Sequence, residues 1–280
     1  MTLLDSTTKL NQNKGLNQNK GLDQNFDHMA DRFADNIYGS KKGAIRLAIL
    51  DRDLTEGLER ADSTNEQNKM HILDAGGGLG HASIALAQKG HQVLLCDISE
   101  EMVKRASVRV EEARLTQFMQ CKHLTAQQAA EQNPQKFDLL LFHAVLEWME
   151  SPKQSLEQVL NAVKPGGYCS LMFFNVHSII HRNLIRGNLR KVKSEQFGGD
   201  GKGLTPINPL EPQDVIEWLA EFGWEVVLES GVRVFYDNMT KASQQKISLE
   251  DILEMEMKYS RQLPYKYLGR YIHVLCKRRA

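Results

Sequence analysis

Apolar and polar positions form regular blocks along most of the chain. Short apolar runs bounded by turn residues are typical of strands in a parallel sheet, which are buried on both faces. Between these runs, apolar residues recur every three or four positions, as they do on one face of a helix. Strands that alternate with helices of this length imply right-handed crossovers and a layered α/β fold. Seven strands are expected at residues 70–73, 93–96, 118–124, 137–142, 168–174, 224–235 and 269–277.

The helical segments flank and separate these strands. The apolar spacing over residues 26–58 is interrupted near Tyr38-Gly39-Ser40, which predicts two helices ahead of the sheet. Ser99 is a suitable helix N-cap, because its hydroxyl can accept a hydrogen bond from the first turn. The short segment 125–128 is expected to be a loop that leaves the third strand. Further helices are expected at residues 81–89, 99–114, 213–222 and 248–262.

A polar repeat precedes the predicted core. The unit Leu-Asn-Gln-Asn-Lys-Gly occurs twice and then in part within residues 10–25. It is too polar to bury apolar surface, so residues 1–24 are expected to be a disordered tail. Residues 25–280 are expected to form a single domain, with N-terminal helices at 25–66. An insertion at 176–212 interrupts the alternation with basic residues, followed by a stretch rich in glycine and proline.

Length and composition suit one globular domain with appendages. Of the 280 residues, 41% are hydrophobic and 25% are charged. The formal net charge is zero, so a nucleic-acid partner would have to bind a local basic patch. The four cysteines are scattered without a C-x-x-C pair, which argues against a zinc site or a disulfide framework. No secretion signal and no apolar run of about 18 residues is present, so a cytoplasmic protein without membrane contact is expected.

The most informative segment is the glycine-rich run Leu-Asp-Ala-Gly-Gly-Gly-Leu-Gly at residues 73–80. Glycines let the backbone turn tightly and leave its amides open to a ligand, where a Cβ atom would intrude. Asp97 ends the next apolar run, at a position where a carboxylate can accept both hydroxyl protons of an adenosine ribose. The strand, the glycine turn, the following helix and this acid describe one half of a Rossmann-like nucleotide site.

Two cofactors share this arrangement, and the spacing of the glycines separates them. An NAD fingerprint requires G-x-G-x-x-G, but counting from Gly76 reaches His81 and counting from Gly78 reaches Ser83. The glycine that allows close helix packing under a pyrophosphate is therefore missing. The observed G-x-G-x-G resembles class I methyltransferases, whose cofactor S-adenosyl-L-methionine carries no phosphate. NAD binding and a turn without a ligand are the alternative interpretations.

Four longer segments narrow the resemblance. Residues 36–46, 141–148, 230–235 and 268–273 together resemble the tRNA 5-carboxymethoxyuridine methyltransferase family, and the similarity extends over about residues 25–277. The resemblance implies a Rossmann-like class I methyltransferase fold, a mostly parallel seven-stranded sheet with helices on both faces and an antiparallel last strand. It also implies transfer of a methyl group from S-adenosyl-L-methionine to the carboxylate of 5-carboxymethoxyuridine at the wobble position of a tRNA. The product of that reaction is a methyl ester.

The resemblance implies a cofactor site with a role for each matched position. Arg46 would hold the methionyl carboxylate with its planar guanidinium, whereas an isolated arginine is more often solvated. His143 follows a buried strand and could act as a base, but a carboxylate with a pKa of about 4 is already ionised. No catalytic base is required, so His143 is interpreted as a positioning residue. The expected cofactor contacts are Arg46, Gly76, Gly77, Gly78, Asp97, Ala126, Gln127 and His143.

Basic residues in the C-terminal half are candidates for substrate binding. Arg233 and Arg270 lie on the last two predicted strands near the expected pocket, and Tyr271 is expected to assist them. Because neighbours on a strand point to opposite faces, either Arg270 or Tyr271 is expected to face away from the pocket. The basic insertion is expected to contact tRNA phosphates, with a solvated helix face as the alternative. The residues proposed for that contact are Arg182, Arg186, Arg190 and Lys191.

Three other functions stay open at this point. Methylation of a small free carboxylic acid predicts methyl transfer without tRNA and a dispensable insertion. A cofactor-binding RNA module without catalysis predicts tRNA binding and no esterified nucleoside. A carboxymethyl-transferring relative would use a closely related cofactor, and the motifs do not exclude it.

Overall fold

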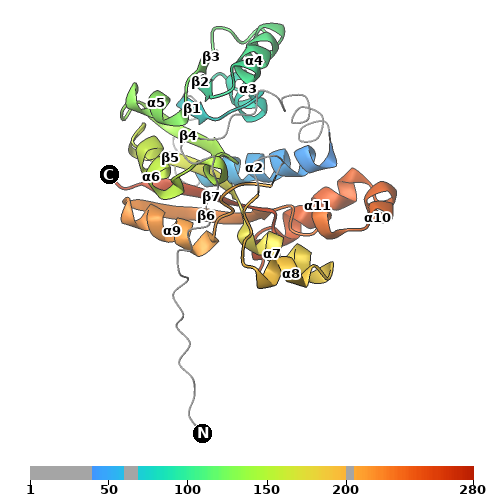
Figure 1. Ribbon diagram of the computed structural model, residues 1–280. Coiled ribbons are helices and arrows are strands. Elements are labelled where there is room, and N and C mark those ends of the chain that lie inside the picture. The colour runs from blue at the N-terminus through green and yellow to red at the C-terminus, as the bar shows by residue number, and fades with distance from the viewer. Residues whose placement is uncertain (1–39, 60–68, 200–204) are drawn as a thin grey trace.

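Seven strands form one continuous sheet through the centre of the molecule (Figure 1). The computed structural model describes residues 40–59, 69–199 and 205–280 of the chain. The strands stand in the order β3-β2-β1-β4-β5-β7-β6. Their bounds are β1 His71–Ala75, β2 Gln92–Asp97, β3 Met119–His123, β4 Phe137–His143, β5 Val163–Phe174, β6 Trp224–Val232 and β7 Tyr271–Arg278.

Strands β1 to β5 are mutually parallel, and β7 runs antiparallel between β5 and β6. The expected mostly parallel seven-stranded α/β sheet with an antiparallel last strand is therefore confirmed. The strand order reverses between β1 and β4, which pair directly. In open α/β sheets, ligands bind beyond the carboxyl ends of the strands at such a reversal, so the fold itself indicates where to look for a site.

Helices cover both faces of the sheet, as expected. One face packs against α2 Lys41–Glu59, α3 His81–Gln88 and α4 Glu100–Glu112. The opposite face packs against α5 Ala126–Glu131, α6 Pro152–Leu160 and α9 Pro212–Glu221. Within β1, Ile72 belongs to the first apolar cluster and Leu73 to the second. Side chains that alternate between two apolar clusters explain the nearly continuous apolar runs in the sequence.

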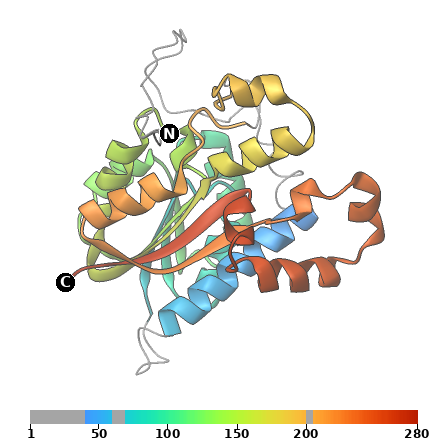
Figure 2. The same ribbon diagram turned by 90° about the horizontal axis from the view of Figure 1, so that it is seen from below.

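Shorter elements gather around the carboxyl-end edge of the sheet and beside α2 (Figure 2). They are η3 Leu146–Trp148, α7 Val176–Ile185, α8 Leu189–Lys193, η4 Tyr236–Asn238, α10 Lys241–Lys246, α11 Leu249–Tyr259 and η5 Tyr265–Leu268. A third apolar cluster joins α2 to α11 and to the ends of β5 and β6 through Ile45, Met172, Val232 and Ile252. This packing brings residues from both ends of the chain to one edge of the sheet.

Two local predictions are wrong. The segment after β3 is not a loop, because the Thr125 hydroxyl accepts a hydrogen bond from Gln128 N and so caps α5. A helix of six residues is too short to show apolar periodicity, which is why the sequence pattern missed it. The sixth strand ends at Val232 instead of Phe235, because Arg233 adopts a left-handed backbone conformation with φ of 60°.

Other local predictions are confirmed or lie outside the described residues. Ser99 caps α4 by accepting a hydrogen bond from Met102 N at 3.1 Å. The first of the two helices predicted ahead of the sheet and the tail at 1–24 lie outside the described residues, so the domain division at residue 25 stays a prediction. Across the described ranges, no helix combines the length and the apolar character that crossing a bilayer requires. All four cysteines are free thiols.

Candidate active site

The glycine-rich loop between β1 and α3 is shaped for close approach of a ligand. The amides of Gly76 and Gly77 both donate to the carbonyl of Cys96, at 2.8 and 3.1 Å, which fixes the turn against β2. A Cβ on Gly76 would lie 2.5 Å from the side chain of Val145, so there is no room for a side chain at this position. At Gly78, where φ is 54°, no atom lies within 4 Å of the place that a Cβ would take. The loop therefore presents bare backbone to open space at Gly78, as a cradle for a cofactor requires.

Asp97, the last residue of β2, lies directly beside this loop. Its Oδ2 accepts a hydrogen bond from Gly78 N and its Oδ1 from Ser99 N, both at 2.9 Å. These two amides hold the carboxylate in one orientation at the carboxyl end of the strand. The position and the orientation fit the diol of a ribose.

Asp74 is the last residue but one of β1, and the sequence pattern assigned it no role in the site. It is buried beneath the loop and accepts a hydrogen bond from the Ser83 hydroxyl. Burial, and to a smaller degree the charge of Asp97, raise its pKa to about 7. Near neutral pH a large fraction of Asp74 is therefore protonated. The sequence did contain a signal for this residue, because an acidic side chain inside an otherwise apolar strand is unusual.

The predicted adenine contacts lie at the start of α5. Ala126 packs in the same apolar cluster as Ala75 and Cys96, so the first turn of α5 borders the carboxyl ends of β1 and β2. Gln127 follows in that turn, and its side-chain amide is 3.5 Å from the hydroxyl of Ser155 on α6. The structure thus brings both predicted residues to the same edge as the glycine loop and Asp97.

Arg46 is not a solvated surface arginine. It lies on α2 with 7% of its surface exposed, and its guanidinium stands 4.7 Å from the centre of the Tyr271 ring. The guanidinium of Arg233 stands 5.3 Å from the same ring. A cation near an aromatic ring is stabilised by the charge distribution of the ring. Tyr271 therefore holds two arginines, from α2 and from the end of β6, close to one another.

A second carboxylate gathers further arginines. Asp237 Oδ2 lies 3.2 Å from Arg233 Nη2 and 3.8 Å from Arg270 Nε. The pKa of Arg182, on α7, is lowered by burial and by the neighbouring charge of Arg270. Three buried guanidinium atoms, the Nε atoms of Arg182, Arg233 and Arg270, have no hydrogen-bond partner among the described residues. Arg46, Arg182, Arg233 and Arg270 are called the arginine cluster below.

Buried donors without partners indicate a missing anionic ligand, because an unpaired buried donor is costly. Three carboxyl groups lie with the arginine cluster: Asp237, Glu147, which follows β4, and Glu256 on α11, whose pKa is raised by burial and by the charge of Asp237. Glu147 is 1% exposed, and its burial raises its pKa to about 7 although the charge of Arg46 opposes this shift. Four guanidinium groups beside three carboxyl groups leave an excess of at least one positive charge, and of two when Glu147 is protonated. The cluster can therefore receive one anionic group, and a second when Glu147 is protonated.

One substrate prediction needs correction. Arg270 precedes the first residue of β7, so strand alternation does not apply to it, and Arg270 and Tyr271 both contribute to the arginine cluster. Arg186, Arg190 and Lys191 lie at the end of α7 or within α8, and their expected contact with tRNA phosphates stays a prediction. Arg182, on α7, lies near Arg270 of the cluster and near Asp237. Alternation fails at Arg270 because the chain turns through η5 and Gly269 immediately before β7.

His143 ends β4, and the structure supports its interpretation as a positioning residue. Its Nε2 lies 2.8 Å from the hydroxyl of Ser170 on β5. Burial lowers its pKa well below the ordinary value, and the charges of His273 and Arg46 act in the same direction. The ring is therefore neutral near pH 7. The next residue, Ala144, has φ of 59°, which turns the chain sharply after the strand.

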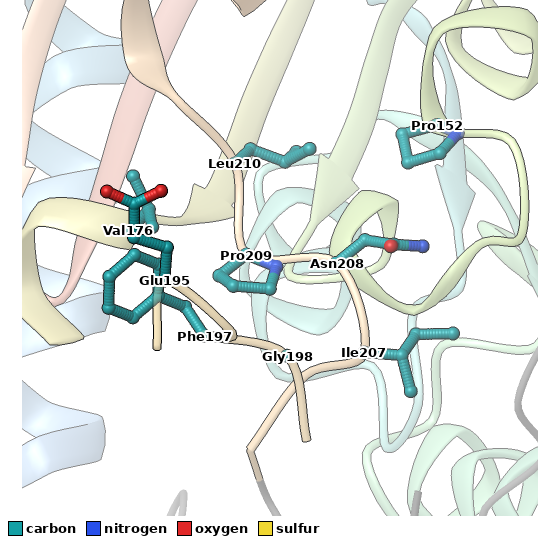
Figure 3. A pocket seen from close by; sticks show the side chains of 9 residues that line it. All are labelled: Pro152, Val176, Glu195, Phe197, Gly198, Ile207, Asn208, Pro209 and Leu210. Carbon is teal, nitrogen blue, oxygen red and sulfur yellow. The ribbon is translucent and has the colours of Figure 1, made fainter. Parts of the chain in front are cut away.

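A cavity of about 310 Å³ lies between the insertion and the beginning of α6 (Figure 3). Phe197 and Asn208 line it, together with Pro152 at the start of α6. Asn208 donates from its backbone to Glu147 O and from its side chain to Met149 O, which connects this wall to η3. The cavity therefore lies next to the site. Within the described ranges, no group of three or more His, Cys, Asp or Glu side chains could hold a metal ion.

The fold and this site together define a class I S-adenosyl-L-methionine-dependent methyltransferase. Residues 73–169 match a family model described as a methyltransferase domain. A magnesium protoporphyrin IX methyltransferase from Synechocystis PCC 6803, solved with bound S-adenosylhomocysteine, superposes with a TM-score of 0.59 at 16% identity, covering 90% of this chain and 95% of that one. A putative sarcosine dimethylglycine methyltransferase from Galdieria sulphuraria gives the same TM-score at 13% identity, covering 89% and 98%. These two likenesses show the fold.

The chain belongs to the tRNA 5-carboxymethoxyuridine methyltransferase family. It is 41% identical over 254 residues to the protein of that name from Escherichia coli K12, covering 91% of this chain and 96% of the relative. A ubiquinone biosynthesis O-methyltransferase from Colwellia psychrerythraea is 26% identical over 188 residues, covering 67% of this chain and 74% of that protein. The expected enzyme class and the expected cofactor, S-adenosyl-L-methionine, are confirmed.

Proposed function

We propose that this enzyme transfers a methyl group from S-adenosyl-L-methionine to the carboxylate of 5-carboxymethoxyuridine at the wobble position of a tRNA. The observation that carries the proposal is the excess positive charge of the arginine cluster beside the cofactor edge. The reaction brings together two anionic groups, the methionyl carboxylate of the cofactor and the carboxylate of the modified uridine. An acceptor without a carboxylate would leave one of these positions without an anion.

We assign the two anions to different parts of the cluster. Arg46, which extends from α2 toward the ends of β4 and β7, holds the methionyl carboxylate. Arg233 and Arg270, with Arg182 behind them, hold the substrate carboxylate. The unusual backbone of Arg233 supports this role, because strained conformations persist where function requires them. The other cofactor contacts are Gly76, Gly77, Gly78, Asp97, Ala126, Gln127 and His143.

The chemistry needs positioning and no proton transfer. When bound, the cofactor supplies an electrophilic methyl group, so a carboxylate oxygen forms the ester bond as the sulfur–carbon bond breaks and S-adenosylhomocysteine leaves. The arginine cluster holds the carboxylate ionised and in line with the methyl group, about 3 to 3.5 Å away. Burial of Arg46 and Arg233 helps to exclude water from the attacking oxygen. The low pKa of His143 is in keeping with this mechanism, since no base is required.

The tRNA would lie against α7 and α8. Arg186, Arg190, Lys191 and Lys193 lie along this surface, close to the half-buried Arg182. Basic side chains on an exposed surface neutralise phosphates, and such binding weakens as salt is raised. A wobble nucleotide lies in a loop, where an unstacked base can enter a pocket. A tRNA substrate also agrees with the cytoplasmic location expected from the sequence.

Nucleoside mass spectrometry tests the proposal. The purified enzyme is incubated with S-adenosyl-L-methionine and tRNA from cells that lack it, and the same tRNA is analysed before and after. We expect the methyl ester of 5-carboxymethoxyuridine to appear as its free acid disappears. Esterification of a small free acid but not of tRNA would favour a small-molecule methyltransferase instead. Binding of tRNA without any ester would favour a non-catalytic RNA module, and a carboxymethylated product would identify a carboxymethyl-transferring enzyme.

A further inference from the structure

A chain of hydrogen bonds leads from His143 through the sheet to α2. His143 Nε2 lies 2.8 Å from Ser170 Oγ, and Ser170 Oγ lies 2.8 Å from His273 Nε2. His273 Nδ1 lies 2.7 Å from Asp53 Oδ2. Ser170, His273 and Asp53 have no exposed surface. The chain thus connects the end of β4 with β5, β7 and the helix α2.

The far end of this chain is firmly anchored. Asp53 Oδ1 lies 2.7 Å from Arg52 Nη2 and 2.6 Å from Arg261 Nη2, and Arg261 Nη1 lies 2.6 Å from Glu56 Oε2. Two guanidinium groups and two carboxylates are therefore balanced without any charge on His273. The carboxylate of Asp53 can only accept hydrogen bonds, so Nδ1 of His273 carries a proton and donates it to Asp53.

In the neutral imidazole of His273, a proton on Nδ1 determines every other proton position in the chain. Nε2 then has no proton, so it accepts a hydrogen bond from the Ser170 hydroxyl. Ser170 has then used its only proton, so its oxygen must accept from His143 Nε2. The neutral His143 therefore carries its proton on Nε2, and its Nδ1 is a lone pair that points away from Ser170.

We propose that Asp53, His273 and Ser170 are positioning residues that hold His143 in one orientation and one tautomer, so that its Nδ1 offers a fixed acceptor to an N–H donor of the bound cofactor. Without these hydrogen bonds, the ring of His143 could rotate or exchange tautomers. A protonated ring nitrogen would then face the N–H donor of the cofactor and repel it. The inference depends on the proposed cofactor contact of His143 and not on the identity of the RNA substrate.

Calorimetry with S-adenosylhomocysteine tests the inference on the full chain. We expect Ser170→Ala to raise the dissociation constant about tenfold, the usual effect of losing one well-placed hydrogen bond. Ser107→Ala is the control, because the half-buried Ser107 also loses one side-chain hydrogen bond, which it donates to Val103 O within α4, away from Asp53 and both histidines. Ser107→Ala should leave the dissociation constant within about twofold. Equal losses in the two variants would overturn the inference.

A double-variant cycle separates positioning from general damage. If Ser170 acts through His143, Ser170→Ala should have no further effect on binding in a His143→Ala background. A tenfold loss in that background as well would contradict the inference. Nitrogen NMR of the histidine-labelled wild-type enzyme provides a readout that does not depend on folded variants. We expect His143 protonated at Nε2 and a change at Nδ1 when S-adenosylhomocysteine binds, whereas the opposite tautomer would refute the proton assignment. Failure of tRNA esterification would leave these measurements unaffected.

Discussion

Replacing Arg233 with lysine tests the division of the arginine cluster between cofactor and substrate. Arg233 is 8% exposed, lies 3.2 Å from Asp237 and stands 5.3 Å from the Tyr271 ring. Lysine keeps the positive charge, so Asp237 and the charge balance of the cluster are preserved. It loses the planar fork that bonds a carboxylate through two parallel N–H groups.

The expected loss follows from that difference. A hydrogen bond to a charged group contributes about 1.5–3 kcal/mol, which corresponds to a fall of about 10- to 150-fold in kcat/KM for tRNA. The cofactor contacts assigned to Arg46 and Asp97 are untouched. The affinity for S-adenosylhomocysteine should therefore stay within about threefold of wild type.

The assay combines ester formation on tRNA with calorimetry of cofactor binding. Arg278→Lys is the matched control, because Arg278 is a partly buried arginine at the far end of β7 that donates to Val163 O. It should retain both activities. If Arg233→Lys lost cofactor affinity as strongly as turnover, Arg233 would belong to the methionyl site. If it lost neither, the assignment of the substrate carboxylate would be wrong.

Three further predictions concern the loop, the buried acid and the basic surface. Gly78→Ala should weaken S-adenosylhomocysteine binding at least tenfold in calorimetry, because the new Cβ enters the cradle, and should lower stability by only about 1 kcal/mol for the left-handed φ; unchanged binding would mean that the ligand lies elsewhere. Asp74 has a raised pKa in the folded protein, so the stability that its protonation contributes is fully present below about pH 4 and is lost as the pH rises through about 7. Asp74→Asn keeps an acceptor for Ser83 without this titration, so thermal melts should show the variant gaining on wild type between pH 4 and pH 7, by up to about 4 kcal/mol, and a constant difference would refute the raised pKa. Changing both Arg190 and Lys191 to alanine should weaken tRNA binding and reduce the slope of log affinity against log salt by about 1 to 2, whereas an unchanged slope would place the RNA on another face.

The sequence by itself determined the elements and the cofactor edge of this protein. Strand and helix periods, the spacing of Gly76, Gly78 and Gly80, and the acid at Asp97 depend on residues that are neighbours in the chain or lie one strand and one helix apart. Local sterics and alternation act over such distances, so these features could be predicted.

Only the tertiary structure decided the substrate side and the buried groups. Asp53 and His273 are 220 positions apart, and their contact exists because β7 inserts between β5 and β6 while α2 packs across that face. Arg270 and Tyr271 reach the same cluster because the chain turns before β7, which no alternation rule could show. The high pKa of Asp74 likewise comes from desolvation by surrounding elements. Burial and long-range charge contacts depend on how the strands are ordered in space, and neither follows from the local pattern of residues.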